Sequence, residues 1–170
     1  MRRVAGRLIA TLYRLAYFGR VRGSNFIIRP MSQIRVARGN YVRIGHNVMI
    51  GSGARIVANG GDIEIGDNVF IGKNSTLIAF SNLTIGAGSL IGQNCSIHTE
   101  NHGGPGRRLE YTTRPVRIDE DVWLGAGVVV TAGKWIGAGA TVGANSVVTK
   151  NLEPGFTYAG VPAKHLPARS

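Results

Sequence analysis

Aliphatic residues recur every six positions over most of the chain between Ile44 and Glu153. In each six-residue unit the first residue is aliphatic, the second is usually Gly, the fourth is mostly Asn or Gly, and the fifth is small or aliphatic. Clear copies are IGHNVM at Ile44, IGDNVF at Ile65 and IGQNCS at Ile91. A period this short indicates a solenoid, in which each turn buries its apolar row against the next turn.

Three consecutive units make one triangular turn of about 18 residues. The fifteen leading aliphatic residues form five triplets, at 44/50/56, 65/71/77, 85/91/97, 118/124/130 and 136/142/148. We expect the first residue of each unit to point inward and the fourth to lie at a corner, since Asn and Gly tolerate positive φ best. Residues 25–43 look like a degenerate first turn. The pattern predicts an all-β chain, a parallel β-helix of about five to six coils over residues 25–153.

One large interruption breaks the repeat. Ile118 follows Ile97 after 21 residues where the period requires six, so fifteen residues, about 103–117, should leave the coil and return to it. This segment is rich in Gly, Pro and Arg and has no period. A loop of this length in an otherwise economical fold is usually functional. After the repeat ends at Pro154, residues 154–170 are expected to form a tail.

The net charge of +11 belongs entirely to the N-terminal third of the chain. Residues 1–61 contain eleven arginines but no lysine or acidic residue, whereas residues 62–170 contain nine basic and nine acidic side chains. This asymmetry indicates either a polyanionic partner or surface, or arginines that only keep an outer face soluble. We do not expect nucleic-acid binding, because the arginines are not interleaved with a known motif.

The N-terminal 24 residues are expected to form a basic amphipathic helix. Its apolar side would carry Val4, Leu8, Leu12 and Leu15. Such a helix suits peripheral contact of residues 1–20 with an anionic membrane, and it suits equally well a cap on the first coil. No segment reaches the roughly 18 apolar residues of a membrane span. The single cysteine, Cys95, fits a reducing compartment, so we expect a cytoplasmic protein, including one at the inner face of the cytoplasmic membrane.

Three segments resemble the hexapeptide-repeat acyltransferases, specifically the sugar and polysaccharide O-acetyltransferases of the galactoside, maltose and colanic-acid types. They are TENHG at 99–103, RPVRIDEDVWLGAGVVV at 114–130 and VGANSVVTKNLEPGFTYAGVPAK at 142–164. The resemblance implies a left-handed β-helix, a homotrimer, acetyl-CoA as cosubstrate and no metal. Asp119, Leu124 and Lys134 depart from the family pattern. A buried lysine is costly, so the Lys134 side chain should leave the coil or the corner beside it should be distorted.

Acyl transfer from a thioester to a hydroxyl needs a base beside the acceptor. By the family's pattern His102 is this base, acting by direct transfer without an acyl-enzyme. His98 either orients His102 or is an exposed corner residue. Glu100 and Asn101 either position His102 or are solvated.

The resemblance also places coenzyme A in a groove between subunits. Backbone groups facing its pantetheine arm would come from Ala126, Gly143 and Ala144. Residues near its phosphates and adenine would be Thr149, Lys150 and Lys164. Candidates for acceptor binding in the loop are Arg107, Arg108, Tyr111 and Arg114, whose arginines would favour an acidic or phosphate-bearing sugar. Trp123 either walls the reaction pocket or packs between subunits.

The sequence therefore predicts an acetyl-CoA-dependent O-acetyltransferase acting on a sugar hydroxyl, in surface-polysaccharide synthesis. Its carbohydrate acceptor would be lipid-linked or nucleotide-linked. One alternative is a γ-class carbonic anhydrase, which binds zinc through three histidines. Here His98 and His102 are four residues apart and His46 lies 52 residues before His98, a spacing that argues against zinc. A non-catalytic scaffold is the other alternative, but it leaves the TENH segment and the AGVPAK tail unexplained.

Overall fold

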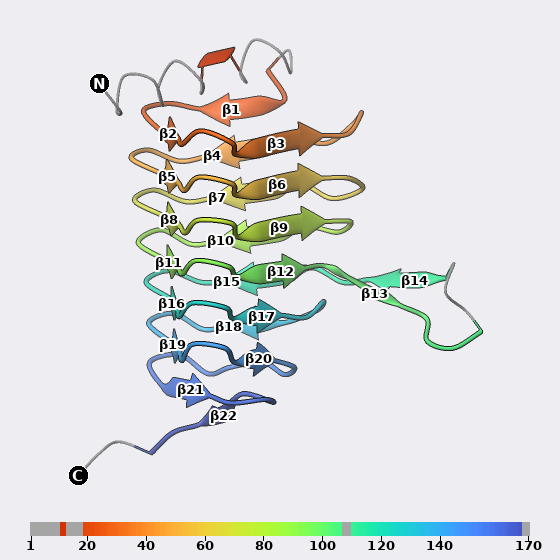
Figure 1. Ribbon diagram of the computed structural model, residues 1–170, viewed down its shortest axis with the longest axis vertical. Helices are drawn as coiled ribbons and strands as arrows, with labels where there is room; N and C mark the ends of the chain where they lie inside the picture. Colours follow the sequence, from red (N-terminus) through yellow and green to blue (C-terminus); the bar gives the residue numbers. More distant parts are fainter. Residues whose placement is uncertain (1–10, 13–18, 107–109, 168–170) are drawn as a thin grey trace.

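The computed structural model describes residues 11–12, 19–106 and 110–167. They form a parallel β-solenoid of about six turns, a stack of three-sided coils along one axis (Figure 1). The coils contribute short strands to three sheets, in which all strands except β22 pair in parallel with the equivalent strand one coil away. The all-β repeat architecture is therefore as predicted.

The three sheets are named here by their strands. Sheet A contains β1 (Val21–Gly23), β4 (Val42–Ile44), β7 (Ile63–Ile65), β10 (Leu83–Ile85), β15 (Val116–Ile118) and β18 (Trp135–Ile136). Sheet B contains β2 (Ile27–Ile28), β5 (Met49–Ile50), β8 (Phe70–Ile71), β11 (Leu90–Ile91), β16 (Trp123–Leu124), β19 (Thr141–Val142), β21 (Thr157–Ala159) and β22 (Lys164–His165). Sheet C contains β3 (Gln33–Val36), β6 (Arg55–Ala58), β9 (Thr76–Ala79), β12 (Ser96–His98), β17 (Val129–Val130) and β20 (Val147–Val148).

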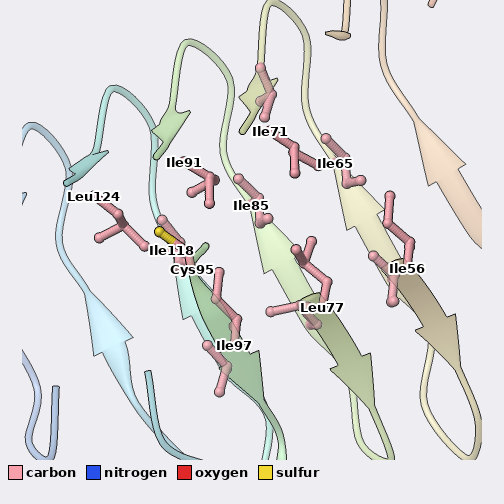
Figure 2. Packing of buried hydrophobic residues seen from close by; sticks show 14 of the residues in the cluster. Ile56, Ile65, Ile71, Leu77, Ile85, Ile91, Cys95, Ile97, Ile118 and Leu124 are labelled. Carbon is pink, nitrogen blue, oxygen red and sulfur yellow. The ribbon is translucent and has the colours of Figure 1, made fainter. Parts of the chain in front are cut away.

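The interior of the solenoid is filled by the leading residue of each repeat. All fifteen are at most 3% exposed, which confirms the predicted inward direction. Figure 2 shows several of them, and Ile65, Ile85 and Ile118 from sheet A form one aligned column. Cys95 lies in the same core and is 1% exposed, and burial raises the pKa of its thiol. Cys95 is thus a small interior residue in this fold.

Corner residues adopt the left-handed conformation that the pattern predicts. Positive φ occurs at the fourth position of ten repeats, at Asn47, Gly53, Asn68, Asn74, Gly88, Asn94, Gly127, Gly133, Gly139 and Asn145. Asp121 does the same in an eleventh repeat, with φ of 55°. A turn of fixed geometry at each corner keeps the coils equal in size, so that equivalent residues stack.

The corner beside Lys134 is regular. Gly133 has φ of 76°, close to that of the other corner glycines. Lys134 itself is half-buried, whereas Val128 and Ala140 at equivalent positions are fully buried. The side chain therefore leaves the core and the corner is undistorted.

Both ends of the solenoid extend further than the repeat count indicated. The expected helix over 1–24 falls mostly on residues outside the described ones, but Val21–Gly23 is strand β1 and pairs with β4. The segment expected as a tail forms β21, which pairs with β19, and β22, which folds back antiparallel on β21. Val21 and Tyr158 are buried in the core, which accounts for both extensions. None of the described helical residues belongs to a helix long and apolar enough to cross a membrane.

The interruption is a β-hairpin rather than a loop over 103–117. Strand β13 (Glu100–His102) pairs antiparallel with β14 (Tyr111–Thr113), and the hairpin projects away from the stack after β12 (Figure 1). Val116 and Arg117 already belong to β15, where Val116 is buried opposite Leu83. The count misplaced this boundary because β15, like β4, β7 and β10, begins two residues before the leading aliphatic residue.

The contribution of the left-handed corner residues to stability can be tested by substitution. Asn94 has φ of 59°, so Asn94→Ala should cost about 1–2 kcal/mol, while Asn94→Gly should cost less because glycine adopts this φ freely. Thermal unfolding should show a midpoint lower by about 2–8 °C for the alanine variant. Asn59→Ala, at an exposed residue without positive φ, is the control. Equal losses for the alanine and glycine variants would contradict the strain argument.

Candidate active site

The hairpin is fastened to the solenoid at Thr99. This side chain is fully buried, and its Oγ1 accepts hydrogen bonds from the backbone N–H groups of Phe80 at 2.8 Å and Ser81 at 2.9 Å. The Thr99 carbonyl accepts a third bond from the N–H of Arg114 at 2.8 Å, which ties the returning strand to the departing one. No separate role for Thr99 was expected from the sequence, although a buried hydroxyl between two coils needs such partners.

Three polar side chains meet at the base of the hairpin. The His98 Nδ1 lies 2.9 Å from Glu100 Oε1, and its Nε2 lies 2.8 Å from the Ser96 hydroxyl. The His98 and Glu100 side chains are 32% and 14% exposed. Glu100 thus contacts His98, and the hydrogen bonds of the described residues include none between Glu100 and His102. Its second oxygen, Oε2, is buried and has no hydrogen-bond partner among the described residues.

The sequence analysis did not single out Ser96. Residues 96, 98 and 100 alternate along an extended chain, so their side chains share one face. That spacing is the signal by which the group of Ser96, His98 and Glu100 could have been found.

His102 lies at the outer end of β13 and is exposed. It is directly opposite Tyr111 in the antiparallel pair, so the two side chains project from the same face of the hairpin. Tyr111 contacts Phe80 edge to face, with ring centroids 5.5 Å apart. Because Phe80 follows β9, one coil nearer the N-terminus than β12, the face that carries His102 and Tyr111 is directed toward the N-terminal coils.

The other expected loop residues are placed differently. Asn101 is exposed and lies opposite Thr112 on the other face of the hairpin. Arg114 is also exposed, with its aliphatic part over Gly133, where an added Cβ would come within 3.0 Å of the Arg114 Cβ and Cδ. Arg107 and Arg108 lie outside the described residues. The described part of the loop therefore contributes Tyr111 to the neighbourhood of His102 and places Asn101 away from it.

Residues expected to face coenzyme A lie on the coils after the hairpin. Ala126 and Ala144 are on successive corners between sheets B and C, joined by a bond from the Asn145 N–H to the Ala126 carbonyl at 2.8 Å. Gly143 is adjacent, and a Cβ there would approach the Ala159 Cβ to 3.0 Å. No long side chain therefore projects from Ala126, Gly143 or Ala144 at this corner.

The cationic candidates lie close to the same end. Thr149 and Lys150 follow β20 and are exposed, and Lys164 is exposed in β22. The preceding residue, Ala163, donates its N–H to the Val147 carbonyl at 2.8 Å, which fastens β22 beside β20. Neither lysine forms an ion pair with a described residue, so both ammonium groups are available for phosphates.

An apolar column runs along the outer face of sheet B. Met49, Phe70, Leu90 and Trp123 are paired in register on β5, β8, β11 and β16. Phe70, Leu90 and Trp123 are 39%, 46% and 54% exposed. This column, called here the sheet B apolar column, places Trp123 among exposed hydrophobic side chains and away from the hairpin.

The potential metal-binding side chains of the described residues are dispersed over the chain. No three His, Cys, Asp or Glu side chains among them gather closely enough to hold a metal ion. His46 lies 3.2 Å from the Ser24 hydroxyl, and His165 packs edge to face against Phe156 and Tyr158. The carbonic-anhydrase alternative therefore has no ligand set in this part of the chain.

A family model described as the hexapeptide repeat of succinyl-transferase matches residues 62–81 and 115–150. WcaF of Escherichia coli (strain K12), assigned as a colanic acid biosynthesis acetyltransferase, is 33% identical over 155 residues, which cover 89% of this chain and 70% of WcaF. Galactoside O-acetyltransferase of Lactococcus lactis subsp. lactis is 30% identical over 139 residues, 80% of this chain and 67% of that protein. The chain spans about half or less of several other curated relatives that it matches.

Solved structures share the architecture. A mutant of AntD, an N-acyltransferase from Bacillus cereus in complex with dTDP-4-amino-4,6-dideoxyglucose and coenzyme A, matches with a TM-score of 0.80. The match covers 94% of this chain and 89% of AntD at 22% identity, which makes it a likeness of fold. Family membership is shown by the two relatives that are at least 30% identical and are matched over at least two thirds of their own length. The chain belongs to the hexapeptide-repeat acyltransferase family.

Proposed function

We propose that this protein transfers an acetyl group from acetyl-CoA to a hydroxyl of a sugar during the synthesis of a bacterial surface polysaccharide. The observation that carries the proposal is the hairpin fastened at Thr99, which presents His102 and Tyr111 on one face beside the coils. Two relatives are named as a galactoside O-acetyltransferase and as a colanic acid biosynthesis acetyltransferase, which supports a carbohydrate acceptor.

The proposed base is His102. Its imidazole takes the proton of the acceptor hydroxyl as the hydroxyl oxygen attacks the thioester carbonyl carbon. The new C–O bond forms, the C–S bond breaks, and the sulfur of coenzyme A takes up the proton from His102. His98 is less suited to this role, because Ser96 and Glu100 occupy both of its ring nitrogens.

In this proposal, the acyl donor lies on the C-terminal side of the hairpin. The corner with Ala126, Gly143 and Ala144 offers backbone groups to the pantetheine arm, and Thr149, Lys150 and Lys164 meet the phosphates. The cytoplasmic location and the membrane contact of residues 1–20 remain expectations from the sequence.

We further propose a homotrimer in which the sheet B apolar column is buried against a second copy. Exposed contiguous apolar side chains commonly mark such interfaces. The hairpin also projects outward from its own solenoid, so that a neighbouring copy can supply the second wall of a groove beside His102 (Figure 1). The buried Glu100 Oε2 would then gain a donor from the partner or from the acceptor.

The role of His102 is tested by His102→Ala in an assay of coenzyme A release with a panel of sugars and nucleotide sugars. Loss of a general base should lower kcat by about 10²–10⁴-fold with little change in the KM for acetyl-CoA. His46→Ala is the matched control, because His46 lies on the second coil and its side chain has one hydrogen-bond partner among the described residues, Ser24. Turnover equal to that of the wild type would exclude His102 as the base.

The role of Glu100 is tested independently of turnover. Its carboxylate should hold His98 as the tautomer protonated at Nδ1, so that Nε2 accepts from Ser96. Long-range ¹H–¹⁵N spectra of the imidazoles should show one tautomer in the wild type and a mixture in Glu100→Gln, where a charged acceptor is replaced by an amide. An unchanged His98 spectrum in Glu100→Gln would show that the carboxylate does not determine the tautomer of the His98 ring.

The trimer is tested by Leu90→Asp, which places a charge in the sheet B apolar column. Burying an unpaired carboxylate is costly, so this variant should dissociate toward monomers, as measured by light scattering. Thr84→Asp adds the same charge at an exposed site of β10 on sheet A, and this control variant should remain a trimer. A trimeric Leu90→Asp variant, or a monomeric wild type, would contradict the proposal.

A further inference from the structure

The outer face of sheet C connects the hairpin with the arginine-rich N-terminal coils. One row of this face contains Arg35, Val57, Ile78 and His98, in register from β3 to β12. A parallel row contains Gln33, Arg55, Thr76 and Ser96. The first row ends at His98 and the second at Ser96, both of which belong to the polar group beside the hairpin. Toward the N-terminus, each row contains one exposed arginine.

These two arginines lack the compensation that arginines on sheet A receive. On sheet A, Arg22 and Arg43 each stack on the Tyr41 ring at 5.5 Å, and Arg43 lies 3.7 Å from Glu64. Neither Arg35 nor Arg55 forms an ion pair with a described residue, and the first 61 residues contain no acidic side chain. Sheet C therefore presents uncompensated positive charge in line with the candidate active site.

A recess lies at the Arg35 end of this row. Its volume is about 430 Å³, and its walls are formed by Arg35–Ala37 and Val57–Asn59. The Arg20 guanidinium donates to the Val36 carbonyl at 3.1 Å, so a further cation borders the recess. The surface combines a guanidinium with short apolar side chains, which suits a compact anion attached to a larger molecule.

The spacing relates the recess to the hairpin. Neighbouring strands of a sheet are about 4.8 Å apart, so β6 lies about 10 Å and β3 about 14 Å from β12. The face of the hairpin with His102 and Tyr111 is directed along this path, because Tyr111 contacts Phe80 at the end of β9. An acceptor whose hydroxyl is at His102 would extend over Phe80 toward Arg55 and Arg35.

We propose that the acceptor carries an anionic group, and that Arg35 and Arg55 bind this group about two to three coils away from the hydroxyl that is acetylated. The chemistry fits a pyrophosphate that links the sugar to a nucleoside or a lipid, and it fits the carboxylate of an acidic sugar. Donor and acceptor then occupy opposite sides of the hairpin, with coenzyme A toward Lys150 and Lys164. This inference rests on the proposed function for the hydroxyl transfer, but anion binding is measured without turnover.

The test is calorimetric binding of three probes, namely uridine diphosphate, geranyl diphosphate and glucuronate, in saturating coenzyme A so that the donor site is filled. The wild type should bind at least one probe, and the identity of that probe distinguishes nucleotide, lipid and acidic-sugar sources. Binding should weaken at least tenfold in Arg35→Gln/Arg55→Gln, since each guanidinium contributes a charge-assisted contact. Arg22→Gln removes the same charge from sheet A and should bind like the wild type.

The second part of the test is steady-state kinetics with two matched acceptors, one that carries the bound anion and one uncharged sugar. In the double variant, the KM for an acceptor that carries the bound anion should rise at least tenfold. Its kcat and its KM for acetyl-CoA should change less than twofold. With the uncharged sugar, its kinetics should equal those of the wild type. If the wild type acetylates no acceptor, the proposed function is wrong. The binding measurements still show whether Arg35 and Arg55 form an anion site. Absence of binding by the wild type, equal weakening in Arg22→Gln, or a raised KM for acetyl-CoA would overturn the inference. Binding to anionic phospholipid vesicles in place of all three probes would overturn it as well.

Discussion

Parallel hydrogen bonding between successive coils is the constraint on which the rest of this structure depends. Each strand pairs with its equivalent one coil away, and the Asn and Gly corners keep every coil the same size. A slip of one residue would turn Ile85 outward and Thr84 inward, because side chains alternate along a strand. Register therefore creates both the aliphatic core and the outer columns, including the rows of sheet C that lead from Arg35 and Arg55 to His98 and Ser96.

The hairpin is tolerated because it leaves and returns without disturbing this register. Ser96 pairs with Val129 across the insertion, and Leu83 pairs with Val116, as if residues 100–113 were absent. The lost corner is replaced by the Thr99 hydroxyl, which satisfies two backbone donors of the preceding coil. A side chain at the base of the hairpin is consequently held by a rigid scaffold, which functional groups require.

Most of the fold could be predicted from the sequence, because a six-residue period repeats one physical solution many times. The hairpin could not, since Glu100–His102 and Tyr111–Thr113 have no periodic signal and their pairing depends on a loop of unknown shape. The partner of Glu100 was also missed. Nearness in sequence suggested His102, whereas the extended strand places Glu100 beside His98 two residues away. Thr99 was overlooked because its importance arises from contacts with another coil.

The distribution of charge along the axis has a consequence for catalysis. A transferase with two substrates must bring both reacting atoms to one base while their charged ends stay apart, because two polyphosphate groups repel each other in a shared groove. A solenoid solves this geometrically, since ligand contacts can be spread over coils on either side of one interruption. Here the uncompensated arginines of sheet C precede the hairpin, and the exposed Lys150 and Lys164 follow it. The direct transfer proposed above, with two anionic ligands, requires such a division of charge, whereas a structural scaffold has no need for it or for a buried Glu100 Oε2 without a partner among the described residues.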